Sequence, residues 1–259
     1  MNQLHVLETN ILHASDVIFW LDGTSAEAPA DMLRIAEPLL LQLTTRPRDL
    51  QVVHGGGKTA FMRRPVNEIV AGAASAADKQ APLTPTFTVA GVASDSAGRY
   101  VPRRFRIEAG NGAGHGLVVY PSPLGTRFGP AGGLTGTLRF NGSEAPVPWA
   151  LLTMVVTTAV GTLLSFRCQA SARGDFMLPL NRLPPLPKGI ASYSAELSIK
   201  ALASASVDAP LDPADLVSMD LGDLDSDDAF SSPIGLSVVP GKIRLIRSSN
   251  RDHVTVQPH

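Results

Sequence analysis

The chain has 259 residues, which is more than one domain of ordinary size needs, so one large unit or two to three small ones are expected. Hydrophobic residues make up 44% of the chain and charged residues 17%, with 23 glycines and 21 prolines, a balance that excludes wholesale disorder and predicts short elements joined by turns. The 22 Lys and Arg against 23 Asp and Glu give a formal charge of -1, which disfavours general nucleic-acid binding.

The first elements of the chain have the composition of β-strands. Residues 16–21 (DVIFWL) are β-branched and aromatic and end at an Asp-Gly turn. Residues 31–45 are ambiguous, because their leucines fit one helix face while Pro38 interrupts it, and two short strands are slightly favoured over one helix. Residues 50–53, 54–57 and 59–66 then read as strand, flexible turn and strand.

A small, polar, proline-flanked stretch at 71–85 has the composition of a linker and predicts a domain boundary. Beyond it, residues 86–109 alternate about an SDSAG turn and predict a hairpin. The predicted organisation is a β-rich domain at 1–72, a linker at 73–85, a sandwich region at 86–205 that is either one unit or two at 86–130 and 131–205, and an acidic linker with C-terminal strands at 206–259.

The rest of the chain predicts further strands, with turns every eight to twelve residues as in sandwich domains. Residues 145–166 are uncharged and long enough for a membrane helix, but their prolines and β-branched residues favour strands, so no span is expected. In the last strand, KIRLIR at 242–247, Ile243 and Leu245 are expected on a buried face. The fold class is therefore predicted as all-β: two or three small sandwich units in series with little helix.

Two glycine-rich segments resemble nucleotide-binding motifs and fail on spacing. HGGGKT at 54–59 ends like a phosphate-binding loop, but Val52 stands where the motif needs glycine and Pro65 leaves no room for its helix. GNGAGHG at 110–116 has His115 where a dinucleotide fingerprint needs glycine, and a strand rather than a helix follows. Both are expected to be loops, so no cofactor is predicted.

No catalytic or metal-ligating residue is predicted. The G-x-S-x-G and H-E-x-x-H motifs are missing, and the six histidines are scattered. Asp223, Asp225, Asp227 and Asp228 have alternating carboxylates that a Ca²⁺ loop uses, but the EF-hand pattern is broken, and a solvated acidic loop is favoured.

Cysteine usage and the first residues bear on the cellular compartment. In a strand, Cys168 lies on the same face as Phe166 and Leu164, which predicts a buried thiol. Because it is the only cysteine, it has no partner for an intramolecular disulfide. The first thirty residues also lack the basic and apolar regions of a secretion signal. A cytoplasmic location is expected.

Residues 86–205 resemble the transthyretin-like, carboxypeptidase regulatory-like β-sandwich. VAGVASDSAGRYVP carries Gly91, Asp95 and Gly98 at the positions of that family's opening strand and turn. RCQASARGDFMLPL carries Gly174 and Phe176 at its later turn, where Ser171 replaces the usual Asp. The resemblance implies structural roles, with the glycines at positive φ and Asp95 bonded to its own turn.

The serial order of these units resembles accessory structural proteins, such as cap or baseplate components, of phage-tail-like contractile injection systems. That resemblance implies a non-enzymatic assembly protein whose partners are other subunits of a tail-like particle, with homo-oligomers also allowed. The alternative from the same residues is a carbohydrate- or cell-surface-binding module, and a hydrolase is a third, less favoured class.

Overall fold

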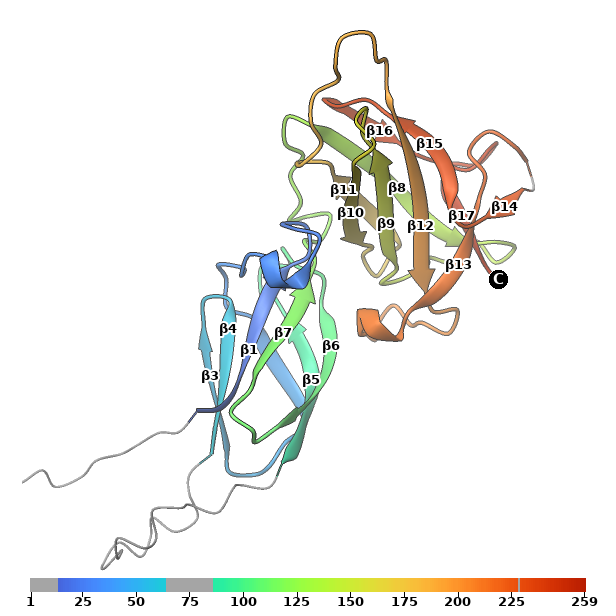
Figure 1. Ribbon diagram of the computed structural model, residues 1–259. Coiled ribbons are helices and arrows are strands. Elements are labelled where there is room, and N and C mark those ends of the chain that lie inside the picture. Colours follow the sequence, from blue (N-terminus) through green and yellow to red (C-terminus); the bar gives the residue numbers. More distant parts are fainter. Residues whose placement is uncertain (1–13, 64–85, 228) are drawn as a thin grey trace, which may run out of the picture.

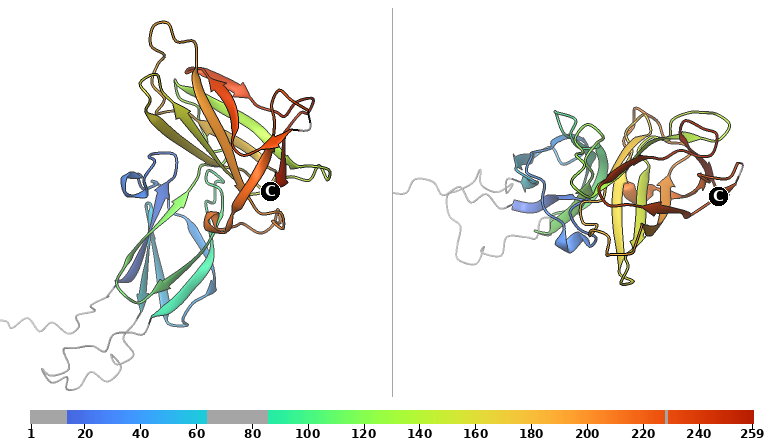
Figure 2. Two further views of the ribbon diagram at one scale, coloured as in Figure 1. Left: turned by 45° about the vertical axis from the view of Figure 1, so that its right-hand side comes forward. Right: turned by 90° about the horizontal axis from the view of Figure 1, so that it is seen from above.

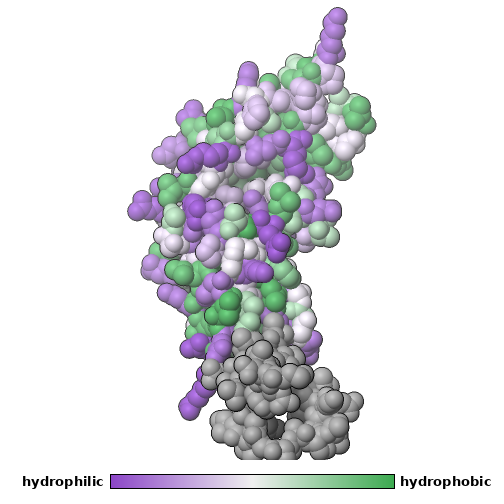
Figure 3. Space-filling model, turned by 90° about the vertical axis from the view of Figure 1, so that its left-hand side faces the viewer, coloured by the Kyte–Doolittle hydropathy of each residue, from purple (hydrophilic) through white to green (hydrophobic). Residues whose placement is uncertain are grey.

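The computed structural model describes residues 14–63, 86–227 and 229–259. The chain is all-β, as the sequence predicts, and its short 3-10 turns include Pro29–Asp31 and Pro213–Asp215. The strands form two units, a first sandwich at the lower left of Figure 1 and a second sandwich at its upper right. On the face seen in Figure 3, hydrophobic residues lie in small groups among hydrophilic ones.

The first sandwich consists of two sheets built from seven strands. The four-stranded sheet has the order β3-β4-β1-β7, with the bounds Leu50–Gly55, Lys58–Arg63, Ala14–Asp22 and Gly114–Val119. The three-stranded sheet has the order β2-β5-β6, with the bounds Leu40–Thr45, Phe87–Ser94 and Arg103–Ala109. Strands β1 and β7 run parallel, and the other neighbours are antiparallel.

Apolar residues that alternate along the strands of both sheets pack together and form the core between them. Trp20 on β1 and Phe105 on β6 meet edge to face, with ring centroids 5.9 Å apart. The Trp20 indole also donates to the Thr59 hydroxyl at 3.0 Å, so its one polar atom is satisfied inside the core. The predicted strand at 16–21, the part of the predicted strands at 50–66 that the structure describes, up to Arg63, and the hairpin at 86–109 form this unit.

The predicted boundary at 73–85 does not separate two domains. Residues 64–85 lie outside the described residues, but the strands on either side of them share the same sheets. Strand β5 pairs with β2, and β7 pairs with β1, across that segment. Linker-like composition indicates a loop, but it cannot show whether the strands beyond it belong to a new sheet. The first sandwich therefore extends to β7, and the change of unit falls close to the alternative division at 130/131.

The second sandwich contains ten strands in one strongly curved, hydrogen-bonded sheet. Seven of them follow the order β10-β9-β12-β13-β17-β8-β11, while β14 pairs with β13, β15 with β12 and β16 with β8. In chain order the bounds are Gly132–Phe140, Leu151–Thr157, Leu163–Gln169, Asp175–Pro179, Tyr193–Ala201, Val217–Gly222, Phe230–Ser231, Ile234–Val238, Lys242–Leu245 and Val254–Pro258 for β8 to β17.

One hydrophobic core fills the space inside this curved sheet. Leu138 on β8, Met154 on β9 and Leu197 on β12 are fully buried in it. Residues 145–166 form β9, a turn and part of β10, as the composition predicts. In the part of the chain that the structure describes, no helix has the length and hydropathy of a membrane span.

The sequence predicted an acidic linker with C-terminal strands at 206–259, but the structure places strands of this segment within the second sandwich. Strand β17 lies between β13 and β8, and its Val254 and Val256 are fully buried in the core. The prediction for 242–247 was also wrong about the buried face, because Ile243 and Leu245 are 59% and 61% exposed while Ile246 is buried. The acidic composition of the segment before these strands gave no sign that the strands after it complete the sheet of the second sandwich.

Residues 31–45 form one strand rather than the two that were favoured. Only β2 is regular, and Arg34 makes an isolated bridge to Leu21. Ile35 and Leu39 are nonetheless buried in the first core, from an irregular segment. Pro38 cannot donate a backbone hydrogen bond, which is consistent with a strand that begins only at Leu40.

Candidate functional site

The two sandwiches are joined by ion pairs and by a small apolar cluster. Arg103 on β6 bonds to Asp212 of the second sandwich at 2.9 Å, with side chains only 10% and 20% exposed. Burial lowers the pKa of the Arg103 guanidinium, and the charge of Asp212 opposes that shift. The neighbouring Arg104–Asp215 pair, at 2.7 Å, is half exposed on both sides. The buried pair fixes β6 against the loop before β13.

Trp149 lies at the centre of the apolar part of this junction. It is 6% exposed and packs with Val101, Leu211 and Leu216. Its φ of 61° lies in the left-handed region, which is costly for a bulky residue and persists only where the surroundings enforce it. The indole donates to the Ser206 carbonyl at 2.8 Å. The junction therefore has a specific, packed geometry.

Glu27, from the loop after β1, makes a second connection between the sandwiches. Its carboxylate accepts from the Ser165 amide at 2.7 Å and lies 3.3 Å from the Arg182 guanidinium. Arg182 also donates to the Ser165 carbonyl and stacks over the Phe166 ring at 4.9 Å. With the Arg103 contacts, this gives two polar attachments, one from strand β6 and one from the loop after β1.

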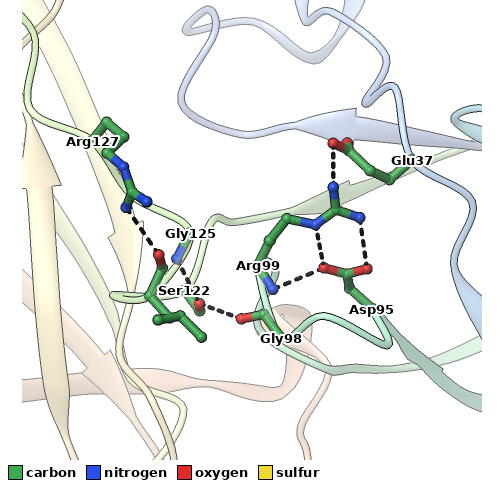
Figure 4. A network of polar contacts seen from close by, with 8 residues as sticks. Glu37, Asp95, Gly98, Arg99, Ser122, Gly125 and Arg127 are labelled. Carbon is green, nitrogen blue, oxygen red and sulfur yellow. Dashed lines mark hydrogen bonds and ion pairs between the residues drawn. The ribbon is translucent and has the colours of Figure 1, made fainter.

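Asp95 and Arg99 form a polar network in the first sandwich (Figure 4). Arg99 donates from its backbone amide and from Nε to one Asp95 oxygen at 2.8 and 2.9 Å, and from Nη2 to the other at 3.0 Å. Its Nη1 contacts Glu37 at 2.8 Å. The Arg99 hydrogen bonds lower the pKa of Asp95 to about 2 against the opposing effect of burial. These groups hold the β5–β6 turn to the segment before β2.

The phosphate-loop-like segment at 54–59 forms a β-hairpin, as expected, with the end of β3, a turn at Gly56 and Gly57, and the start of β4. Gly57 has a φ of 61° between β3 and β4, and a Cβ there would collide with the Ile35 carbonyl. Thr59 is fully buried beneath Trp20, so its hydroxyl is not accessible to an anion.

The segment 110–116, which was expected to be a loop, is one only as far as Ala113, because Gly114 begins β7. It surrounds a buried carboxylate that the sequence did not single out. Asp16, 1% exposed, accepts from the amides of Gly110 and Ala113, the latter at 3.0 Å. His115 Nε2 lies 3.1 Å from Asp16 Oδ1, the same oxygen that accepts from the Ala113 amide. The spacing of 94 to 99 residues between the partners gave no sequence signal. The contacts fix the loop against the start of β1.

In the acidic segment, the carboxylates of Asp223 and Asp227 accept hydrogen bonds from neighbouring groups. Asp223 Oδ1 accepts from the amides of Asp225 and Ser226 at 2.8 and 2.9 Å. Asp227 accepts from Asn250 at 2.7 Å, and hydrogen bonds from Ser249 and Asn250 lower its pKa. Asp228 lies outside the described residues. Within the described ranges, no group of three or more His, Cys, Asp or Glu is placed to hold a metal.

Cys168 is buried in the second core, where the alternation placed it. The thiol is 1% exposed, and burial raises its pKa. A thiol in this environment is protonated and unreactive at neutral pH.

An apolar groove between β15 and β16 is the feature that the sequence interpretation missed. We call it the β15–β16 groove; its volume is about 380 Å³. Its lining residues come from both strands and from the core beneath them: Gly133, Leu134, Leu180, Ser237, Val238, Val239, Lys242, Ile243, Arg244 and Leu245. Among the described strands, β15 pairs only with β12 and β16 only with β8, so both edges facing the groove are unpaired.

No protein-family model, curated protein or solved structure matches this chain. Among the described residues, the geometry defines an all-β chain of two joined sandwiches, with an apolar groove between the unpaired edges of β15 and β16. Functional assignment follows from these features.

Proposed function

We propose that this chain is a non-enzymatic structural subunit of a phage-tail-like contractile injection particle, and that it docks neighbouring subunits through sandwich faces and open strand edges. The observation that carries the proposal is the β15–β16 groove. Its two strands present backbone groups to a partner strand, and Ile243 and Leu245 add exposed apolar surface.

The junction supports an assembly role for the chain as a whole. A subunit that positions other subunits needs a fixed relation between its own parts. The Arg103–Asp212 pair and the cluster around Trp149 supply such contacts. Inter-domain contacts limited to exposed polar groups would instead favour relative motion.

The test is recovery of the tagged full-length chain from its source cells, with identification of what accompanies it. Sheath, tube or baseplate subunits are expected. Leu245→Asp should reduce their yield, whereas Val160→Asp, at an 86% exposed turn position, should not. A stable monomer that brings down no tail subunit would overturn the proposal.

A carbohydrate- or cell-surface-binding module is the second candidate, favoured by a polar pocket on the second sandwich. This pocket, of about 260 Å³, includes Asn141, Asp227, Asn250 and Arg251. Amides, carboxylates and guanidinium groups are suited to hydroxyl-rich ligands. A glycan array without a binder would dismiss this candidate, and a binder whose affinity falls in Asn141→Ala would support it.

A further inference from the structure

The β15–β16 groove arises because two consecutive strands diverge onto different parts of the sheet. A tight turn joins them, in which the Lys242 amide donates to the Val239 carbonyl at 3.2 Å. From that turn, β15 follows β12 while β16 follows β8. Arg244 Nη1 reaches across to the Ser237 carbonyl at 3.2 Å. A strand placed in the groove can bond to two unpaired edges at once.

The side chains around the groove define what such a strand must carry. Ile243 and Leu245 share one exposed face of β16, so residues beside them should be apolar. Arg244 pairs in register with Leu134 and therefore lies on the opposite face of β16 from Ile243 and Leu245, where it is exposed and reaches the Ser237 carbonyl. Lys242 and Arg244 place positive charge along this edge. The matching strand is apolar on both faces, contains an acidic residue and has no Lys or Arg.

Residues 4–8 of this chain, Leu-His-Val-Leu-Glu, have that composition. In an extended conformation Leu4, Val6 and Glu8 share one face, and Leu7 lies on the other. Glu8 is the one acidic residue among residues 1–13, which contain no Lys or Arg. Leu4 and Val6 suit the apolar floor, and Glu8 complements the charge of Lys242 and Arg244.

The placement of the two elements indicates that the groove and the segment belong to different copies. Strand β1, which follows residues 1–13, begins at the lower end of the first sandwich in Figure 1, whereas β16 lies near the upper end of the second. The left view of Figure 2 shows the same separation. A segment at one end and its acceptor at the other produce a head-to-tail contact, which continues from copy to copy.

We infer that residues 4–8 of one copy add as a strand to the β15–β16 groove of a second copy, so that the chain assembles head to tail. This inference deepens the proposed assembly role and rests on it. It names a second copy of this chain as the partner and an extended, acidic-apolar segment as the ligand.

The experiment compares the self-association of the full chain with that of a variant lacking residues 2–9, by sedimentation velocity over a concentration series. The full chain should form oligomers and the deletion variant should remain monomeric. Leu245→Asp should weaken association about tenfold, because it introduces a charge beside the apolar added strand. Val160→Asp is the matched control and should associate like the parent, and circular dichroism checks that each variant is folded.

A labelled peptide of residues 2–9 tests the ligand directly. It should bind the deletion variant and lose about tenfold in affinity when its Val6 is changed to Asp. Oligomers that persist without residues 2–9, or a peptide that does not bind, would overturn the inference. A full chain that stays monomeric yet enters a tail-like particle would overturn head-to-tail assembly alone. Self-association through the groove without any tail partner would contradict the particle assignment and leave the groove contact standing.

Discussion

At the scale of single residues, the chain places its charged groups in specific pairs that connect distant segments. Asp95 is bonded by Arg99, which also bonds Glu37, so that the β5–β6 turn and the segment before β2 share one network. Asp16 does the same for the 110–116 loop and β1. These carboxylates stabilise the connections between strands, where backbone ladders do not reach.

The Asp95–Arg99 pair predicts a specific acid dependence of stability. The folded pKa of about 2 lies below the ordinary 3.8, so the stabilisation is complete above about pH 4 and is lost as the pH falls towards 2. Solvent screening at the 42% exposed Arg99 reduces the contribution to about 1–2 kcal/mol. Unfolding free energies of the parent and Asp95→Asn should differ by that amount at pH 7 and converge near pH 2. An unchanged difference at both pH values would contradict this assignment.

Gly98 tests the turn itself. Its φ is 68°, as the SDSAG pattern predicted, and a Cβ would meet only a Leu124 methyl at 3.8 Å, so backbone strain is the main cost of a side chain. Gly98→Val should reduce the unfolding free energy by about 1–2 kcal/mol, measured by chemical denaturation. Gly235→Val is the matched control, because Gly235 lies in a strand with no atom near its Cβ position, and it should be neutral. Equal effects of both substitutions would show that the strain at residue 98 is not decisive.

The turn at 95–98 could be predicted from the sequence because the residues that form it are adjacent. The ion-pair partners of its charged residues are distant in the sequence. Arg99 is four residues from Asp95 but 62 residues from Glu37. Asp16 and the 110–116 loop are further apart still. Composition and alternation carry no information about such pairs, so the turn was predicted and the network was not.

At the scale of elements, the alternation of apolar and polar residues predicted where strands form. Whether a strand face is buried depends on what packs against it, which alternation does not show. The segment 242–247 illustrates the limit. Its pattern predicted a strand, and β16 forms, yet Ile243 and Leu245 are exposed because they lie on the face opposite to that of the core residue Leu134. The groove, which carries the proposed function, could not be predicted because it results from the divergence of β15 and β16.

Removal of residues 236–259 tests how far the last strands belong to the core. If 206–259 were a linker with C-terminal strands outside the sandwich, as the sequence predicted, the sandwich would stay folded without them. The structure predicts unfolding of the second sandwich instead, because the deletion removes β16 and β17 and the buried residues Val238, Ile246, Val254 and Val256. Each buried aliphatic side chain lost costs on the order of 2 kcal/mol or more. Loss of the cooperative transition of that unit in calorimetry is the expected result, and a retained transition would contradict it.

At the scale of the whole molecule, the class of the units was predictable and their number was narrowed to two or three, but their boundaries were not predictable. Frequent turns and few charges indicated serial β-sandwiches, and two are present. The linker-like composition at 71–85 suggested a boundary, but β5 to β7 return to sheets begun by β1 to β4. The sandwich to which a strand belongs is decided by its pairing with strands far away in the sequence. The residues of the strand itself do not show that pairing. The true junction is made by Arg103, Trp149 and Asp212.

The junction supplies the last prediction, which compares its two neighbouring ion pairs. Asp212→Asn leaves the largely buried Arg103 charge without its counterion, which should cost about 2–3 kcal/mol and loosen the two sandwiches. Asp215→Asn removes the partner of Arg104, where both side chains are 51% exposed, and should cost less than about 1 kcal/mol. Chemical denaturation measures the stabilities, and small-angle scattering measures the spread of inter-sandwich distances. Because the pairs lie on adjacent residues of β6, equal effects would show that burial of Arg103 does not hold the sandwiches together.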